Sequence, residues 1–116
     1  MAERRVDLSP GDVWWASPRP TIGRKQGGRR PVLVVAGHEY LATVTTLALV
    51  VPLTSSDRGW PNHVEVRGHV DLPRTSFAMT EQVRVVSRDR LAAPLGRVSP
   101  RCLVEVRSWL VDHLTD

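Results

Sequence analysis

The hydrophobic residues between positions 11 and 87 come in short runs rather than at helical spacing. Residues 13–16, 31–36 and 44–53 are rich in Val, Thr and Trp, and Gly or Pro residues bound them. β-branched and aromatic runs of this kind are typical of strands. The run 31–36 is almost continuously apolar and begins with a proline, which predicts a central strand covered on both faces.

Two further segments complete the predicted β region. Residues 63–67 alternate in polarity, which predicts a strand with one buried and one exposed face. Residues 17–29 contain three glycines and two prolines. This segment of about a dozen residues is longer than an ordinary hairpin needs, and loops of that length are usually functional or disordered.

The C-terminus carries the clearest helical signals. Ser99 is a suitable N-cap, Pro100 fits the first helical position, and Val98 is placed to pack against Leu103. A stripe at helical spacing is expected to face the β core; it consists of Leu103, Val106, Leu110, Val111 and Leu114. A short helical turn is also expected around residues 87–91. The whole pattern predicts a mainly β fold with a C-terminal helix, in which a bent antiparallel, barrel-like sheet is closed by that helix.

Composition narrows the class of protein. A chain of 116 residues with 41% apolar residues suits one domain, here taken as residues 1–116. The single Cys102 forms no internal disulfide, and four isolated histidines do not match structural zinc spacing. No secretion signal or membrane span is visible. We therefore expect a cytoplasmic protein with no cofactor, no bound metal and no membrane association.

Positive charge is concentrated in one part of the chain. The chain has 15 Arg, 1 Lys and 12 acidic residues, a formal net charge of +4. No acidic residue lies between Asp12 and Glu39, whereas this interval holds Arg19, Arg24, Lys25, Arg29 and Arg30. Guanidinium groups match phosphate oxygens, so nucleic acid is the leading partner class. The alternative for any single arginine is a solvated surface charge.

Several motifs, taken in order, resemble those of the MazF/PemK toxins. They are Gly-Asp-Val-Trp-Trp at 11–15, Gly-Gly-Arg-Arg-Pro-Val-Leu-Val-Val at 27–35, Val-Pro-Leu-Thr-Ser at 51–55, Ser76, Glu-Gln-Val-Arg-Val-Val at 81–86, Arg90-Leu91 and Leu95-Gly96. The resemblance runs from about residue 10 to residue 114, and its specificity lies in the order and spacing of the motifs.

The resemblance implies a small SH3-like, MazF/CcdB-type barrel that forms a two-fold homodimer. It also implies the toxin of a type II toxin–antitoxin pair, a sequence-specific endoribonuclease that inhibits translation and growth. Such an enzyme cuts single-stranded RNA without a metal and leaves 2′,3′-cyclic phosphate and 5′-hydroxyl ends. The implied partner is an antitoxin with an acidic, partly disordered segment, and operator DNA is contacted only through that antitoxin.

Two residues match the family's catalytic positions. RNA transesterification needs an aligned 2′-hydroxyl, a proton acceptor, a proton donor and charge stabilisation on the phosphorane. By resemblance, Arg30 is the catalytic arginine and stabilises the phosphate, while Thr54 is the catalytic threonine and orients a phosphate oxygen. The structural alternatives are a strand-edge ion pair for Arg30 and a turn hydrogen bond for Thr54.

The general base departs from the family pattern. Where family loops often read Gly-Ser-Glu-Gln, residues 23–26 read Gly-Arg-Lys-Gln, so Lys25 replaces a carboxylate. Another branch has an Arg-x-Asp pair where this chain has Met79-x-Glu81. Glu81 is the candidate base, and its alternative is an ion pair with Arg84 or another surface arginine.

The remaining candidates would bind RNA. At nucleic-acid interfaces some residues contact phosphates and position the protein, and others contact base edges and read the sequence. The candidates here fall into the same two groups. We assign Trp60 to base stacking, with core capping by this loop tryptophan as the alternative. The candidate RNA-binding residues are Arg24, Lys25 and Arg29 for phosphates, Gln26 and Gln82 for base edges, and Ser55 and Trp60. His63 and His69 are expected to be polar edge positions rather than a metal or acid–base pair.

Two other functions stay open at this stage. One is a CcdB-like toxin, which would have the same fold but would inhibit DNA gyrase by binding it instead of cleaving RNA. The other is a non-enzymatic RNA-binding module that uses only the long loop of residues 17–29, here called the basic loop. The 27–35 and 51–55 motifs favour the RNA-cutting branch over both.

Overall fold

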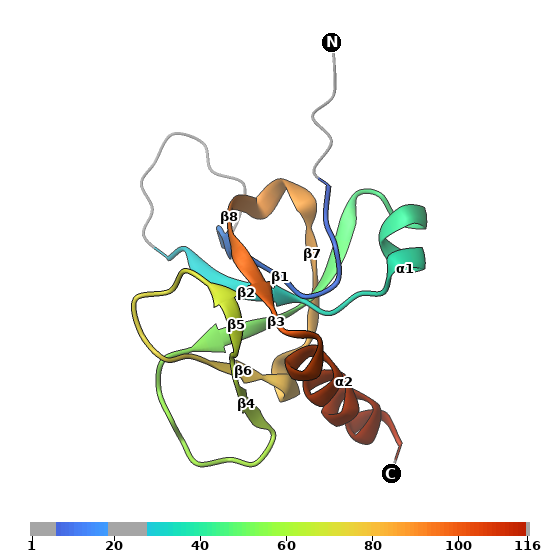
Figure 1. The fold of residues 1–116 in the computed structure, drawn as a ribbon. Helices are drawn as coiled ribbons and strands as arrows, with labels where there is room; N and C mark the ends of the chain where they lie inside the picture. The colour runs from blue at the N-terminus through green and yellow to red at the C-terminus, as the bar shows by residue number, and fades with distance from the viewer. Residues whose placement is uncertain (1–6, 19–27, 116) are drawn as a thin grey trace.

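A computed structural model describes residues 7–18 and 28–115 (Figure 1). These residues form eight strands, two α-helices and two 3₁₀ turns. In chain order they are β1 (Asp12–Ala16), β2 (Arg30–Val34), α1 (His38–Thr43), β3 (Leu47–Thr54), β4 (His63–Glu65), β5 (Gly68–Val70), β6 (Phe77–Met79), η1 (Thr80–Gln82), β7 (Arg84–Ser87), η2 (Arg88–Arg90), β8 (Leu91–Val98) and α2 (Pro100–Leu114).

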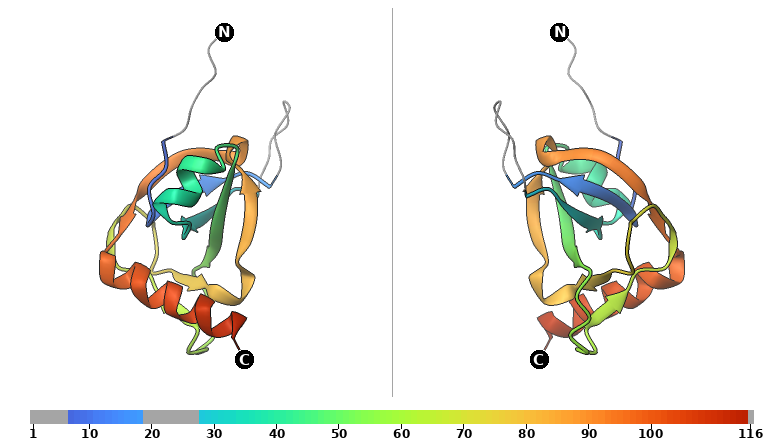
Figure 2. Two further views of the ribbon diagram at one scale, coloured as in Figure 1. Left: turned by 90° about the vertical axis from the view of Figure 1, so that its right-hand side faces the viewer. Right: turned by 90° about the vertical axis from the view of Figure 1, so that its left-hand side faces the viewer.

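The strands form one curled sheet in which every pairing is antiparallel. The strand order is β4-β6-β3-β2-β1-β8-β5, and β7 also pairs with β3. Helix α2 packs against β4 and η1 and covers one side of the curl, as Figure 2 shows. The predicted β class, the barrel-like sheet and the closing helix are confirmed.

The central strands are buried on both faces. Leu33 and Val51 belong to a core cluster that includes Val106 of α2. Val32 and Val34 project the other way, into a second cluster that includes Leu41 of α1. This confirms that the apolar run 31–36 is a central strand. The strand runs from Arg30 to Val34, so it begins one residue and ends two residues earlier than predicted.

Helix α1 lies where the sequence pattern predicts only β structure. It has six residues and buries only Leu41, so it is too short to show a 3.6-residue hydrophobic period. Its C-terminal end is held by Arg88, which donates hydrogen bonds to the carbonyl oxygens of Leu41 (2.7 Å) and Val44 (3.1 Å) and of Leu47 in β3 (2.9 Å). The missed element depends on this contact between residues distant in sequence.

Helix α2 begins as predicted. The Ser99 hydroxyl accepts a hydrogen bond from the Cys102 amide, and Pro100 occupies the first turn. The predicted buried stripe is wrong at its C-terminal end, because Val111 and Leu114 are 61% and 85% exposed. The helix turns Cys102 and Val106 to the core, with Leu103, Trp109 and Leu110 partly buried.

Two shorter predictions have different outcomes. The helical turn expected around 87–91 is present as η2. The alternation in 63–67 predicts one exposed face, but both His63 and Val64 of β4 are buried. The reason is that the His63 side chain contacts η1 through an ion pair with Glu81.

Candidate functional site

At the N-terminal end of β2, residues of three neighbouring strands form a row across the sheet. Ala16 of β1 pairs with Arg30 on one side and with Leu91 on the other. In the β2–β3 ladder, the pair nearest to this end is Val32 with Pro52. Beyond this pair, Leu53 and Thr54 of β3 pair with β6. Arg30 and Thr54 therefore both lie two residues beyond the last β2–β3 pair, at the same end of two adjacent strands.

Arg30 and Thr54 are both available for a ligand at this end of the sheet. Arg30 is exposed and makes no ion pair within residues 7–18 and 28–115, so the expected alternative of a strand-edge ion pair is not seen there. The Thr54 hydroxyl oxygen accepts a hydrogen bond from the Ser56 amide at 3.1 Å, so the turn hydrogen bond expected as its alternative role is present. That bond uses an acceptor site and leaves the hydroxyl proton free to be donated.

Of the basic residues in the basic loop, the structure describes Arg29. Arg29 precedes β2 and is exposed. The predicted RNA-binding residues Arg24, Lys25 and Gln26 lie outside the described residues.

Glu81 is not part of the row that contains Arg30. It is in η1, which connects β6 and β7. Both of these strands pair with one edge of β3, whereas β2, which carries Arg30, pairs with the other edge. The third predicted catalytic residue therefore lies across β3 from Arg30.

The Glu81 carboxylate is instead bound by neighbours. It accepts hydrogen bonds from Asn62 Nδ2 at 2.8 Å and from His63 Nε2 at 3.0 and 3.1 Å. Partial burial raises the pKa of Glu81, but the bonds from His63, its own backbone amide and Asn62, with attraction to the His63 charge, give a net lowering. The expected alternative for Glu81 is an ion pair with Arg84 or another surface arginine. The structure shows an ion pair, but its partner is His63. Arg84 instead donates hydrogen bonds to Gln82.

His63 lies on the edge strand β4, as expected, but its side chain is part of a buried polar group. Next to its ion pair, the fully buried Thr80 hydroxyl donates to the Asn62 carbonyl at 2.8 Å and bonds Nε2 of His113 at 3.0 Å. Because His113 is on α2, this group joins β4, η1 and the helix. His63 Nδ1 is buried and has no hydrogen-bond partner in the described part of the chain. His69 in β5 is exposed, as expected.

The other predicted RNA-binding residues are spread around this region. Ser55 follows Thr54 directly and is exposed. Trp60, in the β3–β4 loop, is 47% exposed, and its ring packs against His63 with centroids 4.9 Å apart. The Arg58 guanidinium carbon lies 6.0 Å from the Trp60 ring centre. Gln82 is exposed in η1 and bonds Arg84.

Arg90 is a further candidate for the site, and the sequence analysis did not select it as a site residue. Arg90 directly precedes Leu91, at the β8 end of the same row, and its carbonyl accepts a hydrogen bond from Ser17. Its Nε is buried without a hydrogen-bond partner among the described residues. The signal was present, because the Arg90-Leu91 pair is among the motifs that resemble the family.

Neither a metal centre nor a membrane span is found in what the structure describes. Across residues 7–18 and 28–115, no three His, Cys, Asp or Glu side chains come together as metal ligands. No described helix has the length and apolar character needed to cross a bilayer.

Two curated relatives match most of this chain. The sequence is 31% identical over 102 residues to an endoribonuclease MazF of Staphylococcus saprophyticus, covering 84% of this chain and 83% of that protein. It is 32% identical over 99 residues to the endoribonuclease toxin MazF of Escherichia coli K12, covering 84% and 86%.

Solved structures show the same fold. The crystal structure of MazF from Deinococcus radiodurans superposes with a TM-score of 0.75 at 31% identity, covering 94% of this chain and 97% of that one. A MazE-MazF structure from the same organism gives a TM-score of 0.72 at 28% identity, covering 97% and 98%. A family model described as the PemK-like, MazF-like toxin of type II toxin–antitoxin systems matches residues 9–114, and the chain belongs to that family.

Proposed function

We propose that this protein is an endoribonuclease toxin that cleaves single-stranded RNA by transesterification, leaving 2′,3′-cyclic phosphate and 5′-hydroxyl ends. The observation that carries the proposal is the placement of Arg30 and Thr54 at the same end of the adjacent strands β2 and β3. The curated relatives, which are named endoribonucleases, support the same activity.

Arg30 and Thr54 have different roles in this reaction. The attacking 2′-hydroxyl belongs to the RNA, so no protein nucleophile is needed and the protein must stabilise charge on the phosphorane. Arg30 supplies a fixed positive charge and two donors to the phosphate oxygens. It is an electrostatic group rather than an acid, because a guanidinium scarcely deprotonates in proteins. Thr54 donates its free hydroxyl proton to a second phosphate oxygen.

Glu81 is better suited to positioning than to proton transfer. Its carboxylate is bound by Asn62 and His63, and η1 lies across β3 from Arg30. A general base must reach the proton it abstracts through a hydrogen bond or one water. We therefore assign Glu81 to holding η1 against β4, which orients the segment between β6 and β7.

The RNA would follow a surface that runs from the basic loop toward the β3–β4 loop. We assign phosphate contacts to Arg29 together with Arg24 and Lys25. Trp60 offers an exposed ring face for a stacked base. Base-edge contacts are assigned to Gln26 and Gln82, and Ser55 lies beside Thr54.

We also propose that the toxin acts in the cytoplasm as a homodimer and binds an acidic antitoxin, with operator DNA contacted only through that antitoxin. The MazE-MazF crystal structure from Deinococcus radiodurans supports an antitoxin partner. The dimer is supported by exposed apolar side chains on β7 and on α2. Figure 2 shows β7 and the C-terminal end of α2 on the same side of the molecule. These side chains are Val85 of β7 and Val111 and Leu114 of α2, and the exposed Val83 directly precedes β7.

Mapping RNA ends tests this function. Purified protein is incubated with 5′-labelled single-stranded RNAs of varied sequence in EDTA, and the products are analysed for 2′,3′-cyclic phosphate and 5′-hydroxyl termini. Arg30→Ala serves as the inactive control and Arg74→Ala, at an exposed arginine outside the row, as the matched active control. Intact RNA throughout would refute the proposal, and binding without cleavage would favour an RNA-binding module. The gyrase alternative is not favoured, since the curated relatives are named endoribonucleases.

A further inference from the structure

The β3–β4 loop, residues 55–62, holds Trp60 in one place. The Asp57 side chain accepts a hydrogen bond from the Gly59 amide at 2.9 Å, and Gly59 has a φ of 72°, which favours glycine. The Trp60 carbonyl accepts a hydrogen bond from the His63 amide at 3.0 Å. The backbone is therefore fixed on both sides of Trp60.

The Trp60 ring is supported by the buried ring of His63. The two ring centroids are 4.9 Å apart, with the planes tilted by 47°. The chain has six Phe, Tyr and Trp residues, all within the described ranges, and Trp60 is the one among them that is exposed. The structure therefore describes one aromatic side chain that is open to a ligand and held from below by a second ring.

His63 is fixed in turn from η1. Its Nε2 lies 3.0 and 3.1 Å from the two carboxylate oxygens of Glu81. An ionised carboxylate only accepts hydrogen bonds, so Nε2 carries a proton and the imidazole cannot turn over without losing both contacts. Asn62 donates to the same carboxylate at 2.8 Å, which anchors the end of the loop. A chain of contacts thus runs from Glu81 through His63 to Trp60.

A cation lies beside the Trp60 ring. The Arg58 guanidinium carbon is 6.0 Å from the ring centre, at the outer limit of a cation–π contact. Arg58 is exposed and makes no ion pair within residues 7–18 and 28–115. A base on the indole would have this positive charge beside it for its phosphate. Aromatic surfaces next to cations commonly hold single-stranded nucleic acid.

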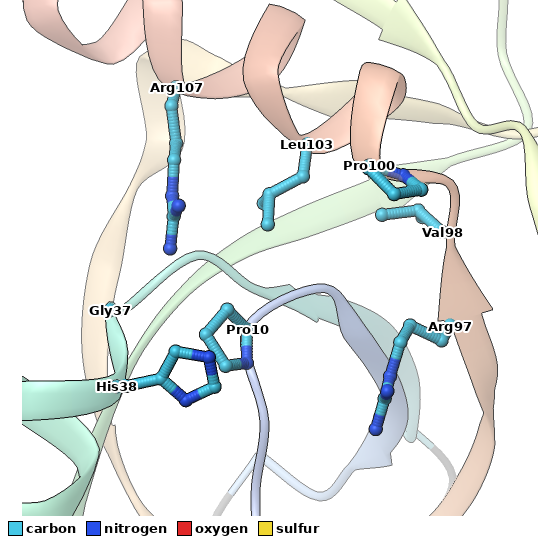
Figure 3. Close-up of a pocket in the computed structure, with 8 residues that line it drawn as sticks. All are labelled: Pro10, Gly37, His38, Arg97, Val98, Pro100, Leu103 and Arg107. Atoms are coloured by element: carbon cyan, nitrogen blue, oxygen red, sulfur yellow. The ribbon is translucent and has the colours of Figure 1, made fainter.

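The pocket between the starts of α1 and α2 offers no such surface (Figure 3). Its volume is about 350 Å³, and none of the eight residues that line it is Phe, Tyr or Trp. Of its two arginines, Arg97 is paired with Asp12, and Arg107 donates to the carbonyl oxygens of residues 35 and 36. Trp60 is therefore the better place for a base.

We propose that His63 positions Trp60 as the stacking surface for one base of the RNA, and that this surface favours a purine. A purine has a larger ring system than a pyrimidine and so covers more of the indole, and differences in stacking strength give modest base preferences. The neighbouring phosphate would contact Arg58. His63 is a positioning residue, because it contacts Trp60 rather than the RNA. The inference rests on the proposed function, since it specifies how the RNA substrate is recognised.

NMR of the full ¹⁵N-labelled chain tests the stacking, with the Trp60 indole N–H identified by its loss in Trp60→Phe. The probes are two 2′-O-methyl undecamers, one all uridine and one with a single central adenosine, which lack the attacking hydroxyl and cannot be cut. The adenosine probe should bind at least about threefold more tightly and shift the Trp60 signal further. The indole signal of the partly buried Trp109, which packs on His113, should not move.

Matched variants test the role of His63. His63→Gln keeps a donor for Glu81 but removes the ring under Trp60, so it should weaken binding of the adenosine probe by about fivefold or more. His69→Gln, at an exposed histidine of β5, should not weaken it. Trp60→Ala should match His63→Gln, and Trp60→Phe should restore most of the binding. NOEs between the rings of residues 60 and 63 in the wild-type complex test the support without a substitution.

Cleavage kinetics separate this inference from the proposed function. On an RNA with a mapped site, His63→Gln should raise KM by about fivefold or more with kcat nearly unchanged, as expected for lost binding alone. Arg30→Ala should lower kcat and keep the Trp60 shift. Equal binding of the two probes, an unmoved Trp60 signal, absent NOEs, or a folded His63→Gln variant that binds like His69→Gln would overturn the inference. RNA that stacks on Trp60 but is never cut would instead refute the proposed cleavage alone.

Discussion

Thr54 illustrates how a backbone bond prepares a side chain for a ligand. Its hydroxyl oxygen is fixed by the Ser56 amide, so the hydroxyl proton can be directed outward. Sequence reasoning identified both Thr54 and Arg30 by motif. That they lie at the same end of adjacent strands follows from the β2–β3 register, in which Val32, Leu33 and Val34 pair with β3.

The hydroxyl of Thr54 is expected to carry its contribution to cleavage. Thr54→Val keeps the shape of the side chain and removes the donor, so the cleavage rate should fall on the order of 100-fold. Thr54→Ser keeps the hydroxyl and should retain most of the activity. Single-turnover cleavage of labelled RNA measures both. A valine variant as active as the serine variant would show that the hydroxyl takes no part.

Glu81 gives a pH-dependent contribution to stability. Its pKa is lower in the folded protein than in the unfolded chain, where it is near 4.5, so the carboxylate stabilises the fold above about pH 4.5. This contribution is lost as the pH falls through the lower, folded-state pKa. Glu81→Gln should therefore lower the free energy of unfolding at neutral pH and flatten its dependence on pH between about 5 and 3.

Urea unfolding across that pH range measures the effect of Glu81→Gln, with Glu39→Gln on exposed α1 as the matched control. The same variant should keep an RNA cleavage rate close to that of the wild type. A loss of cleavage on the order of 100-fold with unchanged stability would instead return Glu81 to the role of general base.

Among the helices and strands, the sequence predicted those whose determining residues lie within a few positions of each other. Helix α2 has its cap and first-turn proline within a few residues, so its start was predicted correctly. Its exposed face was not, because which residues of the helix are buried depends on where β4 and η1 lie. Helix α1 was missed since six residues show no period and its C-terminal contacts come from Arg88. The burial of His63 was missed because its partner Glu81 is far away in sequence.

Arg88 is expected to stabilise the junction of α1, β3 and η2. Arg88→Met keeps much of the apolar stem and leaves the carbonyls of Leu41, Val44 and Leu47 without these donors. A buried carbonyl that loses its partner costs about 1–3 kcal/mol. These three bonds are partly buried, so the free energy of unfolding should fall by about 1–3 kcal/mol in total. Chemical denaturation measures it.

The matched control for Arg88 is Arg67→Met. Arg67 is 68% exposed in its side chain and pairs with Glu65 on the surface, where an ion pair is worth about 0–1 kcal/mol. Equal losses in the two variants would mean that the carbonyl contacts of Arg88 add nothing to stability.

At the scale of the whole molecule, the exposed apolar residues on β7 and α2 predict self-association. Val85 and Val111 are 52% and 61% exposed, so Val85→Asp or Val111→Asp should leave the fold intact and remove a contact between two copies. Light scattering at micromolar concentration should give a dimer for the wild type and a monomer for the variants. A monomeric wild type, or variants that remain dimeric, would contradict this surface.

The most direct test of the account is a double-mutant cycle on Arg30 and Thr54. If both side chains act on the same phosphate, the combined loss in Arg30→Ala/Thr54→Ala should be clearly smaller than the product of the two single losses, as is usual for residues that act as a unit. Single-turnover rates on one mapped RNA, in EDTA, supply the four values. Two single losses that multiply fully in the double variant would mean that the residues act independently, and the shared site would be wrong.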